Sequence, residues 1–147
     1  MRETYRAIIR LMNLLEKTVN SETALSNAAN RMGNNNVRRF LLEKLHEKKR
    51  FTKELEDSVK KIKNTSDFAS MSRRGVILNW LNEEFGYNCT SEKAFIEEVE
   101  YGDKRALGDY ELILQDDGLP YDIKQVLHTH KNKLKEGMTT YEELFSY

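Results

Sequence analysis

The chain lacks the features of a disulfide scaffold or a turn-rich β fold. Among its 147 residues there is one cysteine, Cys89, and one proline, Pro120. A single cysteine cannot form an intramolecular disulfide and suits a reducing compartment. One proline and only seven glycines favour long helices over a β-sandwich or disorder. This length predicts a single domain over residues 1–147.

Long apolar runs and a surplus of one charge are also missing. No N-terminal apolar run resembles a signal peptide, and no stretch approaches the roughly 18 apolar residues of a membrane span. The 24 Lys and Arg residues balance the 24 Asp and Glu residues, so no bulk attraction to nucleic acid or membrane is expected. We therefore expect a soluble, cytoplasmic protein that binds neither.

Four segments carry apolar residues at spacings of three and four, which is typical of amphipathic helices. The pattern predicts helices over about 4–31, 37–63 and 91–115, and a fourth from the 116–120 break to near the C-terminus. In the first helix the predicted core stripe includes Val19 and Ser26.

Turn-forming residues separate these segments. Asn35 or Asn36 is expected to cap the second helix, and Thr90 or Ser91 the third. The stretch 116–120, which contains glycine and proline, cannot continue a helix and ends the third one.

The connection from about 64 to 90 is too long for a hairpin turn. It holds its own amphipathic piece, Met71 to Phe85, and its aromatic residues Trp80, Phe85 and Tyr87 require a surface to cover. A long connection lets the third helix start at the same end of the bundle as the second, as in ferritin-like folds. The predicted fold is therefore an all-α, ferritin-like four-helix bundle with a long helical crossover between helices 2 and 3.

Three short motifs carry a family resemblance. They are EYGDKRALGDY at 100–110, the following Leu119-Pro120 and KRFTKEL at 49–55. With them the chain resembles a bacterial family of ferritin-like four-helix bundles of unknown function. The resemblance implies a ferritin-like fold and a stress-related or metal-linked role, and it implies no established reaction.

A ferritin-like di-iron centre takes a Glu from each of two helices and a Glu-x-x-His from each of the other two, all projecting inward. Glu43 and His46 have this spacing, but at about 100° per residue both lie roughly 140° from the apolar stripe, on the solvent face. His128, three residues after Gln125, also faces away. The inward candidates are Glu22 and Asp103, with His130 on the fourth helix.

The heights of these candidates along the bundle do not match. Glu22 and Asp103 each lie about 17 Å from one bundle end, whereas His130 is displaced by about one turn or more. We therefore expect no intact di-iron centre and no cofactor. Iron bound by a rearranged site is the alternative, and its candidate ligands are Glu22, Glu47, Asp103 and His130.

Lys48 falls in the apolar stripe of the second helix. It could form a buried ion pair with Glu22, Asp103 or both, in the place of a metal. Alternatively, Lys48 extends its ammonium group to solvent and Glu22 lies at a wet edge of the bundle. The pattern does not choose between the two.

The remaining chemistry-bearing residues have structural interpretations. His130 is expected to be a satisfied core or interface histidine. Tyrosines such as Tyr101 and Tyr110 are interpreted as core-edge residues with a hydrated hydroxyl group. No phosphate-binding loop, C-x-x-C or serine–histidine–acid arrangement occurs, so an enzyme is not favoured.

Charge is unevenly distributed along the chain. Residues 36–64 hold ten basic and five acidic residues, a balance of 10 − 5 = +5, and 91–117 hold three and nine, a balance of 3 − 9 = −6. These are either two solvated faces or surfaces for self-association or a charged protein partner. The basic residues Lys44, Lys48, Lys49, Arg50 and Lys53 lack interleaved aromatics, which disfavours nucleic-acid binding.

Two hypotheses follow. The first is a non-enzymatic structural or interaction module, a homodimer, with a degenerate di-iron site. The second is a metal-binding or oxidative-stress protein of ferritin-like type.

Overall fold

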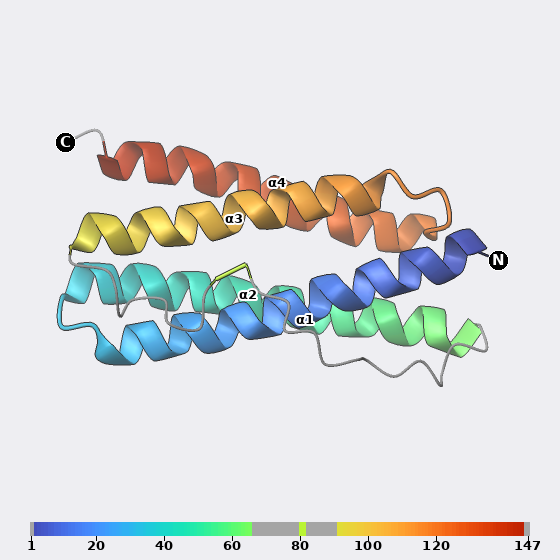
Figure 1. Cartoon of the computed structure of the whole chain (residues 1–147), viewed down its shortest axis with the longest axis horizontal. Coiled ribbons are helices and arrows are strands. Elements are labelled where there is room, and N and C mark those ends of the chain that lie inside the picture. The colour runs from blue at the N-terminus through green and yellow to red at the C-terminus, as the bar shows by residue number, and fades with distance from the viewer. Residues whose placement is uncertain (1, 66–79, 82–90, 146–147) are drawn as a thin grey trace.

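The computed structural model describes residues 2–65, 80–81 and 91–145, and the regular structure in these ranges is entirely helical. The helices are α1 (Arg2–Arg31), α2 (Asn35–Thr65), α3 (Glu92–Leu114) and α4 (Tyr121–Phe145). They lie side by side in an elongated bundle (Figure 1). The predicted all-α, four-helix class is confirmed. None of the described helices combines the length and the apolar character that crossing a membrane requires.

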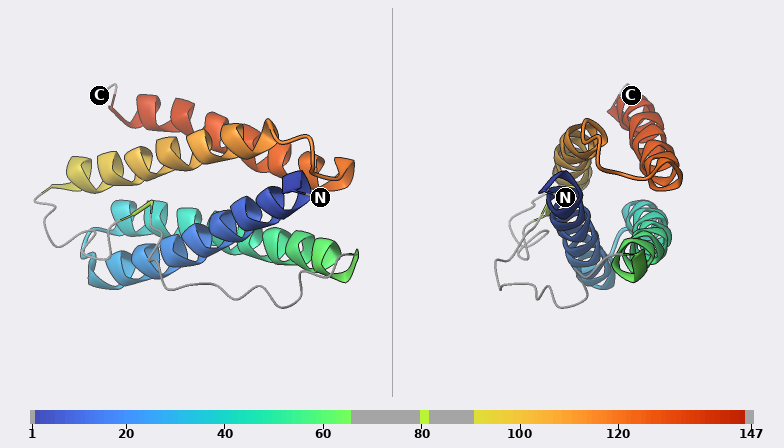
Figure 2. Two further views of the ribbon diagram at one scale, coloured as in Figure 1. Left: turned by 45° about the vertical axis from the view of Figure 1, so that its right-hand side comes forward. Right: turned by 90° about the vertical axis from the view of Figure 1, so that its right-hand side faces the viewer.

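The four helices form two antiparallel hairpins, α1–α2 and α3–α4. In Figure 1, α2 and α3 run in the same direction, opposite to α1 and α4. Seen from the end in Figure 2, α3 lies over α1 and α4 over α2, so α2 and α3 occupy diagonal corners. Asn64 and Thr65, which we assigned to the crossover, belong to α2. The rest of the predicted crossover lies outside the described residues, except for Trp80 and Leu81.

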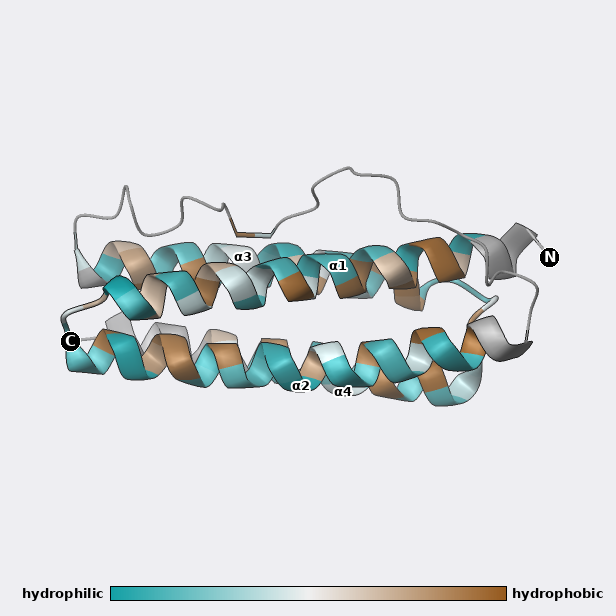
Figure 3. Ribbon diagram, turned by 90° about the horizontal axis from the view of Figure 1, so that it is seen from below, coloured by the Kyte–Doolittle hydropathy of each residue, from teal (hydrophilic) through white to brown (hydrophobic). Residues whose placement is uncertain are grey.

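Apolar residues recur along each helix between polar ones (Figure 3). The predicted stripe of α1 is wrong in its middle, because Val19 is 37% exposed and Leu25, rather than Ser26, is fully buried. Burial in α1 steps from Leu15 to Thr18, a three-residue step where the prediction took four. Steps averaging 3.5 residues are those of helices packed nearly parallel in a bundle.

The helix starts follow from side-chain capping. The Asn34 side chain accepts hydrogen bonds from the backbone N–H groups of Asn36 and Val37, at 2.9 and 3.1 Å. Asn34 therefore caps α2, and the prediction of Asn35 or Asn36 is wrong by one or two residues. Ser91 caps α3 as predicted, because its hydroxyl accepts from the Ala94 N–H at 3.2 Å.

The apolar core has two parts. One cluster gathers around Leu11, Phe51 and Leu127, and the other around Leu25 and Leu41 at the opposite end. All five side chains are fully buried. The two clusters do not merge, and what separates them is polar.

Trp80 and Leu81 are buried against the bundle, Trp80 in the first cluster and Leu81 in the second. Gly102 of α3 makes their approach possible, because a Cβ atom there would lie 2.8 Å from a Leu81 methyl carbon and 3.5 Å from the Trp80 carbonyl oxygen. The expectation that Trp80 covers a surface is confirmed. Phe85 and Tyr87 lie outside the described residues.

Candidate functional site

A layer of polar side chains crosses the bundle between the two apolar clusters. Thr18 and Ser21 of α1, Lys44 and Lys48 of α2 and Asp103 of α3 are all buried. They fall along each helix between residues of one cluster and residues of the other. The layer is the largest concentration of buried charge in the described part of the chain.

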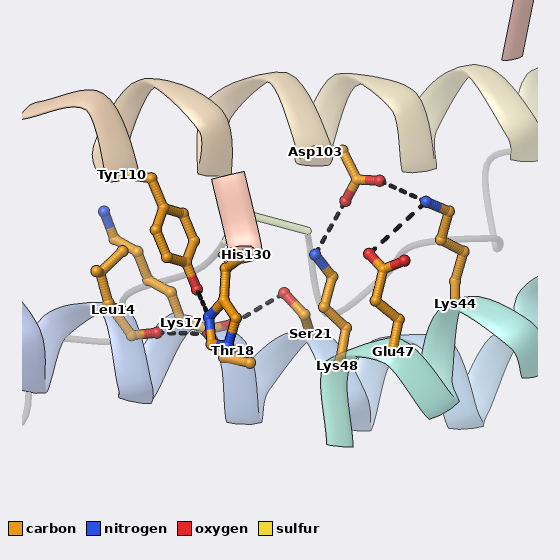
Figure 4. Close-up of polar contacts among 10 residues, drawn as sticks. All are labelled: Leu14, Lys17, Thr18, Ser21, Lys44, Glu47, Lys48, Asp103, Tyr110 and His130. Atoms are coloured by element: carbon orange, nitrogen blue, oxygen red, sulfur yellow. Dashed lines mark hydrogen bonds and ion pairs between the residues drawn. The ribbon is translucent and has the colours of Figure 1, made fainter. Parts of the chain in front are cut away.

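Asp103 lies at the centre of this layer and binds two lysines. Its Oδ1 atom is 3.0 Å from Lys48 Nζ and its Oδ2 atom is 3.0 Å from Lys44 Nζ (Figure 4). Asp103 is 2% exposed and Lys48 is 3% exposed. Each carboxylate oxygen thus accepts a charge-assisted hydrogen bond from a different ammonium group, away from water.

The helix geometry explains how these groups meet. Lys44 and Lys48 are four residues apart, so they project from the same face of α2. Their flexible four-carbon stems reach across the diagonal to Asp103 on α3. Gly137 of α4 leaves room for one of them, because a Cβ atom at 137 would lie 3.0 Å from Lys44 Nζ.

Glu47 completes the charge balance. One of its oxygens is 3.9 Å from Lys44 Nζ, one helical turn away. That oxygen is buried and makes no hydrogen bond within the described residues. With Lys44, Lys48 and Asp103, the cluster has two positive and two negative groups, a balance of 2 − 2 = 0. Such a buried cluster offsets its own desolvation cost only as long as every member is present.

The layer opens to solvent between α2 and α4. A cavity of about 260 Å³ is lined there by residues that include Lys44, Glu47, Lys133 and Glu136. Its walls carry both signs of charge. It therefore gives water a route to the Lys44–Glu47 edge, whereas Lys48 and Asp103 remain enclosed.

A second polar group lies within the first apolar cluster. His130 of α4 is fully buried, and its ring stacks on Phe51 with the centroids 3.9 Å apart and the planes 12° apart. The Tyr110 hydroxyl is 2.8 Å from His130 Nδ1 (Figure 4). The other ring nitrogen, Nε2, is 3.6 Å from a Glu54 oxygen, beyond hydrogen-bonding distance.

The surroundings of His130 determine its protonation and tautomer. Burial, and after it the positive charges of Lys48, Lys133 and Arg50, lower the pKa of His130 to about 3. The ring is therefore neutral at physiological pH. We assign its proton to Nε2, facing the Glu54 carboxylate, because Nδ1 then accepts from the Tyr110 hydroxyl.

Tyr110 remains protonated in this arrangement. Burial first, then the negative charges of Glu54 and Glu47, raise the pKa of Tyr110 well above its usual value of 10. The hydroxyl group is buried with the rest of the side chain. The interpretation of Tyr110 as a core-edge residue with a hydrated hydroxyl is therefore wrong, because its partner is His130 rather than water.

Trp80 is held in place by charged residues. Its indole N–H donates to an Asp109 carboxylate oxygen at 2.7 Å, and Lys17 Nζ lies 2.6 Å from the same oxygen. Arg105 donates to the Trp80 carbonyl at 3.2 Å. The ammonium groups of Lys17 and Lys48 lie 5.9 and 5.7 Å from the centre of the indole ring. Through these contacts Trp80, which lies in the chain between α2 and α3, is attached to α1, α2 and α3.

Of the two interpretations of Lys48, a buried ion pair or an ammonium group extended to solvent, the structure shows the buried ion pair. Its ammonium group pairs with Asp103 in the interior and does not reach solvent. Glu22 has no part in this pair, because it is only half-buried and accepts a hydrogen bond from the Thr52 hydroxyl.

The residues with Glu-x-x-His spacing lie where their phase predicts. Glu43 and His46 are exposed, as is His128 on α4. The four candidate ligands do not converge: Glu47 and Asp103 both approach Lys44, whereas Glu22 accepts from Thr52 and His130 contacts Tyr110. Across 2–65, 80–81 and 91–145, no group of three or more His, Cys, Asp or Glu side chains is arranged to hold a metal ion.

Three participants were missed by reasoning from the sequence. Lys44 was counted with the surface bases, although its four-residue spacing from Lys48 placed both on one face. Tyr110 was not linked to His130, and Asp109 was not linked to Trp80. The last two pairs join residues that are 20 and 29 positions apart, so no local pattern indicates them.

Comparisons with known proteins add no relative. No protein-family model matches the chain, and neither the curated proteins nor the solved structures contain a match.

Proposed function

We propose that this chain is a ferritin-like bundle with a degenerate di-iron site, which acts as a non-enzymatic structural or protein-interaction module. The observation that carries the proposal is Asp103, the most buried of the candidate metal ligands apart from His130, bound by Lys44 and Lys48. The parallel course of α2 and α3 supports a single crossover between them, as in ferritin-like folds, and we assign it to the chain between Thr65 and Ser91. The resemblance in 49–55 and 100–110 supports the same family.

The chemistry of the polar layer is the main argument. Ferritin-like centres need several inward carboxylates whose negative charge the metal neutralises. In this chain two ammonium groups neutralise the central carboxylate instead. They also repel a cation, so the layer suits a structural role in specifying how the helices register.

We further propose that the protein is cytoplasmic and forms a homodimer. The alternative is that it binds a different protein. The lone Cys89 suits a reducing compartment. Much of the acidic surplus of 91–117 is used within the molecule, because Asp103, Asp109 and Asp116 pair with basic residues of other helices. Three basic residues of 36–64 are likewise paired with acids of other helices, Lys44 and Lys48 with Asp103 and Lys61 with Asp122.

Elemental analysis tests the proposal. Protein purified without chelator is expected to contain less than stoichiometric iron, zinc or manganese, and titration with Fe²⁺ is expected to leave the pair Lys48–Asp103 intact. Stoichiometric iron that is lost in Asp103→Asn but retained in the exposed-site control Asp117→Asn would contradict the proposal.

One observation favours a metal-binding or oxidative-stress protein as the second candidate. Glu47 and His130 each have a buried polar atom that makes no hydrogen bond among the described residues, Oε1 and Nε2 respectively. A neutral imidazole is a good metal ligand, and Nε2 of His130 can bind a metal once the ring proton moves to Nδ1, which then donates to the Tyr110 oxygen. Under this candidate, iron binding would be lost in His130→Gln and retained in the matched control His128→Gln, which removes an exposed histidine two residues away.

A further inference from the structure

Trp80 and Leu81 lie outside the four helices, yet both side chains are buried against them. The segment 80–81 lies on the side of the bundle that α1 and α3 form (Figure 3). The cavity beside Lys44 and Glu47 opens on the opposite side, between α2 and α4. The two residues therefore contact the bundle on the side away from that opening.

The surface that receives Trp80 matches an indole ring in its chemistry. Asp109 accepts a hydrogen bond from the indole N–H, and the Lys17 ammonium group holds the same carboxylate oxygen in place. The ammonium groups of Lys17 and Lys48 lie 5.9 and 5.7 Å from the ring centre, where a cation is attracted to the face of an aromatic ring. Gly102 lets the segment 80–81 approach the backbone of α3. All of these groups belong to the helices, so the helices by themselves form the site.

Trp80 and Leu81 contact the polar layer from this side. Lys48 Nζ is 3.0 Å from Asp103 Oδ1 and 5.7 Å from the centre of the indole ring. Leu81 packs over Gly102, the residue that precedes Asp103 on α3. With both side chains in place, Lys48 and Asp103 are buried. Loss of the indole ring would leave a space beside the Lys48 ammonium group that is large and polar enough for water.

We propose that the helices form an indole-binding site whose ligand is Trp80 of the same chain, and that Trp80 is a latch that keeps water from the Lys48–Asp103 pair. The proposal goes beyond the proposed function, because it depends neither on metal content nor on dimer formation. Water beside the pair raises the local dielectric constant and weakens the attraction between the two charges. The indole also contacts Lys17 and Lys48 of the α1–α2 hairpin and Asp109 of the α3–α4 hairpin, so the latch fastens the two hairpins to each other.

Acetylation of lysine side chains measures the closure. An N-hydroxysuccinimide ester acetylates a lysine of the folded protein only as far as its amine meets solvent, and mass spectrometry gives the rate at each position. In Trp80→Ala the rate at Lys48 is expected to rise about tenfold or more, because the covering ring is gone. Lys44, beside the cavity of the same layer, is the internal control and should change by less than about twofold. Tyr121→Ala removes an aromatic ring that is 77% exposed and should change neither rate.

Added indole tests whether the site recognises the ring. Free indole is expected to fill the space left in Trp80→Ala and to return the Lys48 rate to within about twofold of the wild-type rate. 1-Methylindole keeps the ring but has no N–H to donate to Asp109, so it should bind about tenfold more weakly or worse. The wild-type protein, whose site is filled, should respond to neither compound.

Other results overturn the proposal at different points. A Lys48 rate in Trp80→Ala equal to that of the wild type, with the helical circular dichroism retained, disproves closure by Trp80. An equal rise at Lys44 and Lys48 shows a general loosening of the bundle and contradicts a latch. Failure of indole to restore protection, or equal restoration by both compounds, disproves an indole-specific site.

A second variant decides the closure if Trp80→Ala does not fold. Trp80→Phe keeps an aromatic ring over the polar layer and loses only the N–H and part of the ring area. Its Lys48 rate is expected to stay within about threefold of the wild-type rate. A rise at Lys48 of about tenfold in Trp80→Phe, with Lys44 unchanged, would show that an aromatic ring at position 80 does not close the layer.

Discussion

Lys48 of α2 and Asp103 of α3 meet at the centre of the bundle, with 3.0 Å between Nζ and Oδ1, although their helices occupy diagonal corners. The contact depends on the length of the lysine side chain, because two short side chains could not span the diagonal. It also fixes the heights of α2 and α3 relative to each other. The polar layer therefore specifies the register of the two hairpins, while the apolar clusters on either side supply the burial of hydrophobic surface.

Removing the shared carboxylate is expected to cost more than removing either lysine. Asp103→Asn leaves Lys48 without a counter-charge and leaves Lys44 with Glu47 alone, and we expect it to lower the free energy of unfolding by about 3–5 kcal/mol. Lys48→Met leaves Asp103 paired with Lys44 and is expected to cost less. Urea denaturation of both variants measures the difference, and equal losses would contradict the shared-carboxylate arrangement.

Replacing the whole charged cluster should reverse this loss. The quadruple variant Lys44→Met, Lys48→Met, Asp103→Leu, Glu47→Met removes all four charges together, so no buried charge of the cluster is left unpaired. We expect its free energy of unfolding to equal or exceed that of the wild-type chain. A quadruple variant as unstable as Asp103→Asn would show that packing around these side chains, rather than their charge, decides the stability.

His130 is expected to make the bundle less stable in mild acid. The unfolded chain takes up a proton at His130 below its ordinary pKa of 6.5, whereas the folded chain does not until about pH 3. The free energy of unfolding should therefore fall as the pH drops from 6.5 toward 3, by at most about 1.4 kcal/mol per pH unit.

Denaturation curves at pH 7 and pH 5 measure this dependence. His130→Gln should make it shallower, because the residue that takes up the proton only on unfolding is gone. His128→Gln, which removes an exposed histidine of the same helix, is the control. Identical changes in the two variants would show that His130 is not the source.

Two glycines of α3 are expected to respond oppositely to alanine. At Gly102 a Cβ atom would lie 2.8 Å from a Leu81 side-chain carbon, so Gly102→Ala must displace Leu81 and should cost about 1–3 kcal/mol. At Gly108 a Cβ atom meets open space, so Gly108→Ala should stabilise the monomer by up to about 1 kcal/mol. Thermal unfolding at low micromolar concentration compares the two, and a loss at Gly108 as large as at Gly102 would contradict this description.

Trp80 is the only tryptophan and reports directly on its own attachment. Asp109→Leu removes the acceptor of its indole N–H, a charge-assisted bond whose loss costs about 1.5–3 kcal/mol. We expect the emission of Trp80 to shift to the red and its quenching by acrylamide to increase, while circular dichroism keeps its helical signal. Asp117→Asn, which changes an exposed acid, should alter neither property.

Reasoning from the sequence succeeded where a single helix decides the outcome. The periodicity of apolar residues located all four helices to within two residues at the ends that the turns define, and phase alone placed Glu43 and His46 outside and Lys48 and His130 inside. The error at Val19 has the same origin, because a step of three or four residues changes the face and only the neighbouring helices choose between them.

Partners of buried polar groups could not be predicted in this way. Phase shows that Lys48 points inward, but whether it meets Glu22 or Asp103 depends on which helix is diagonal and on the relative heights of the helices. The pairs Tyr110–His130 and Trp80–Asp109 likewise join separate elements at one height. Local periodicity in the amino-acid sequence was enough to predict the four helices and the charged residues on their core faces, because each of these depends on one helix alone. That Asp103 binds two lysines followed only from the folded bundle, because the contact is set by the packing of α2 and α3 against each other.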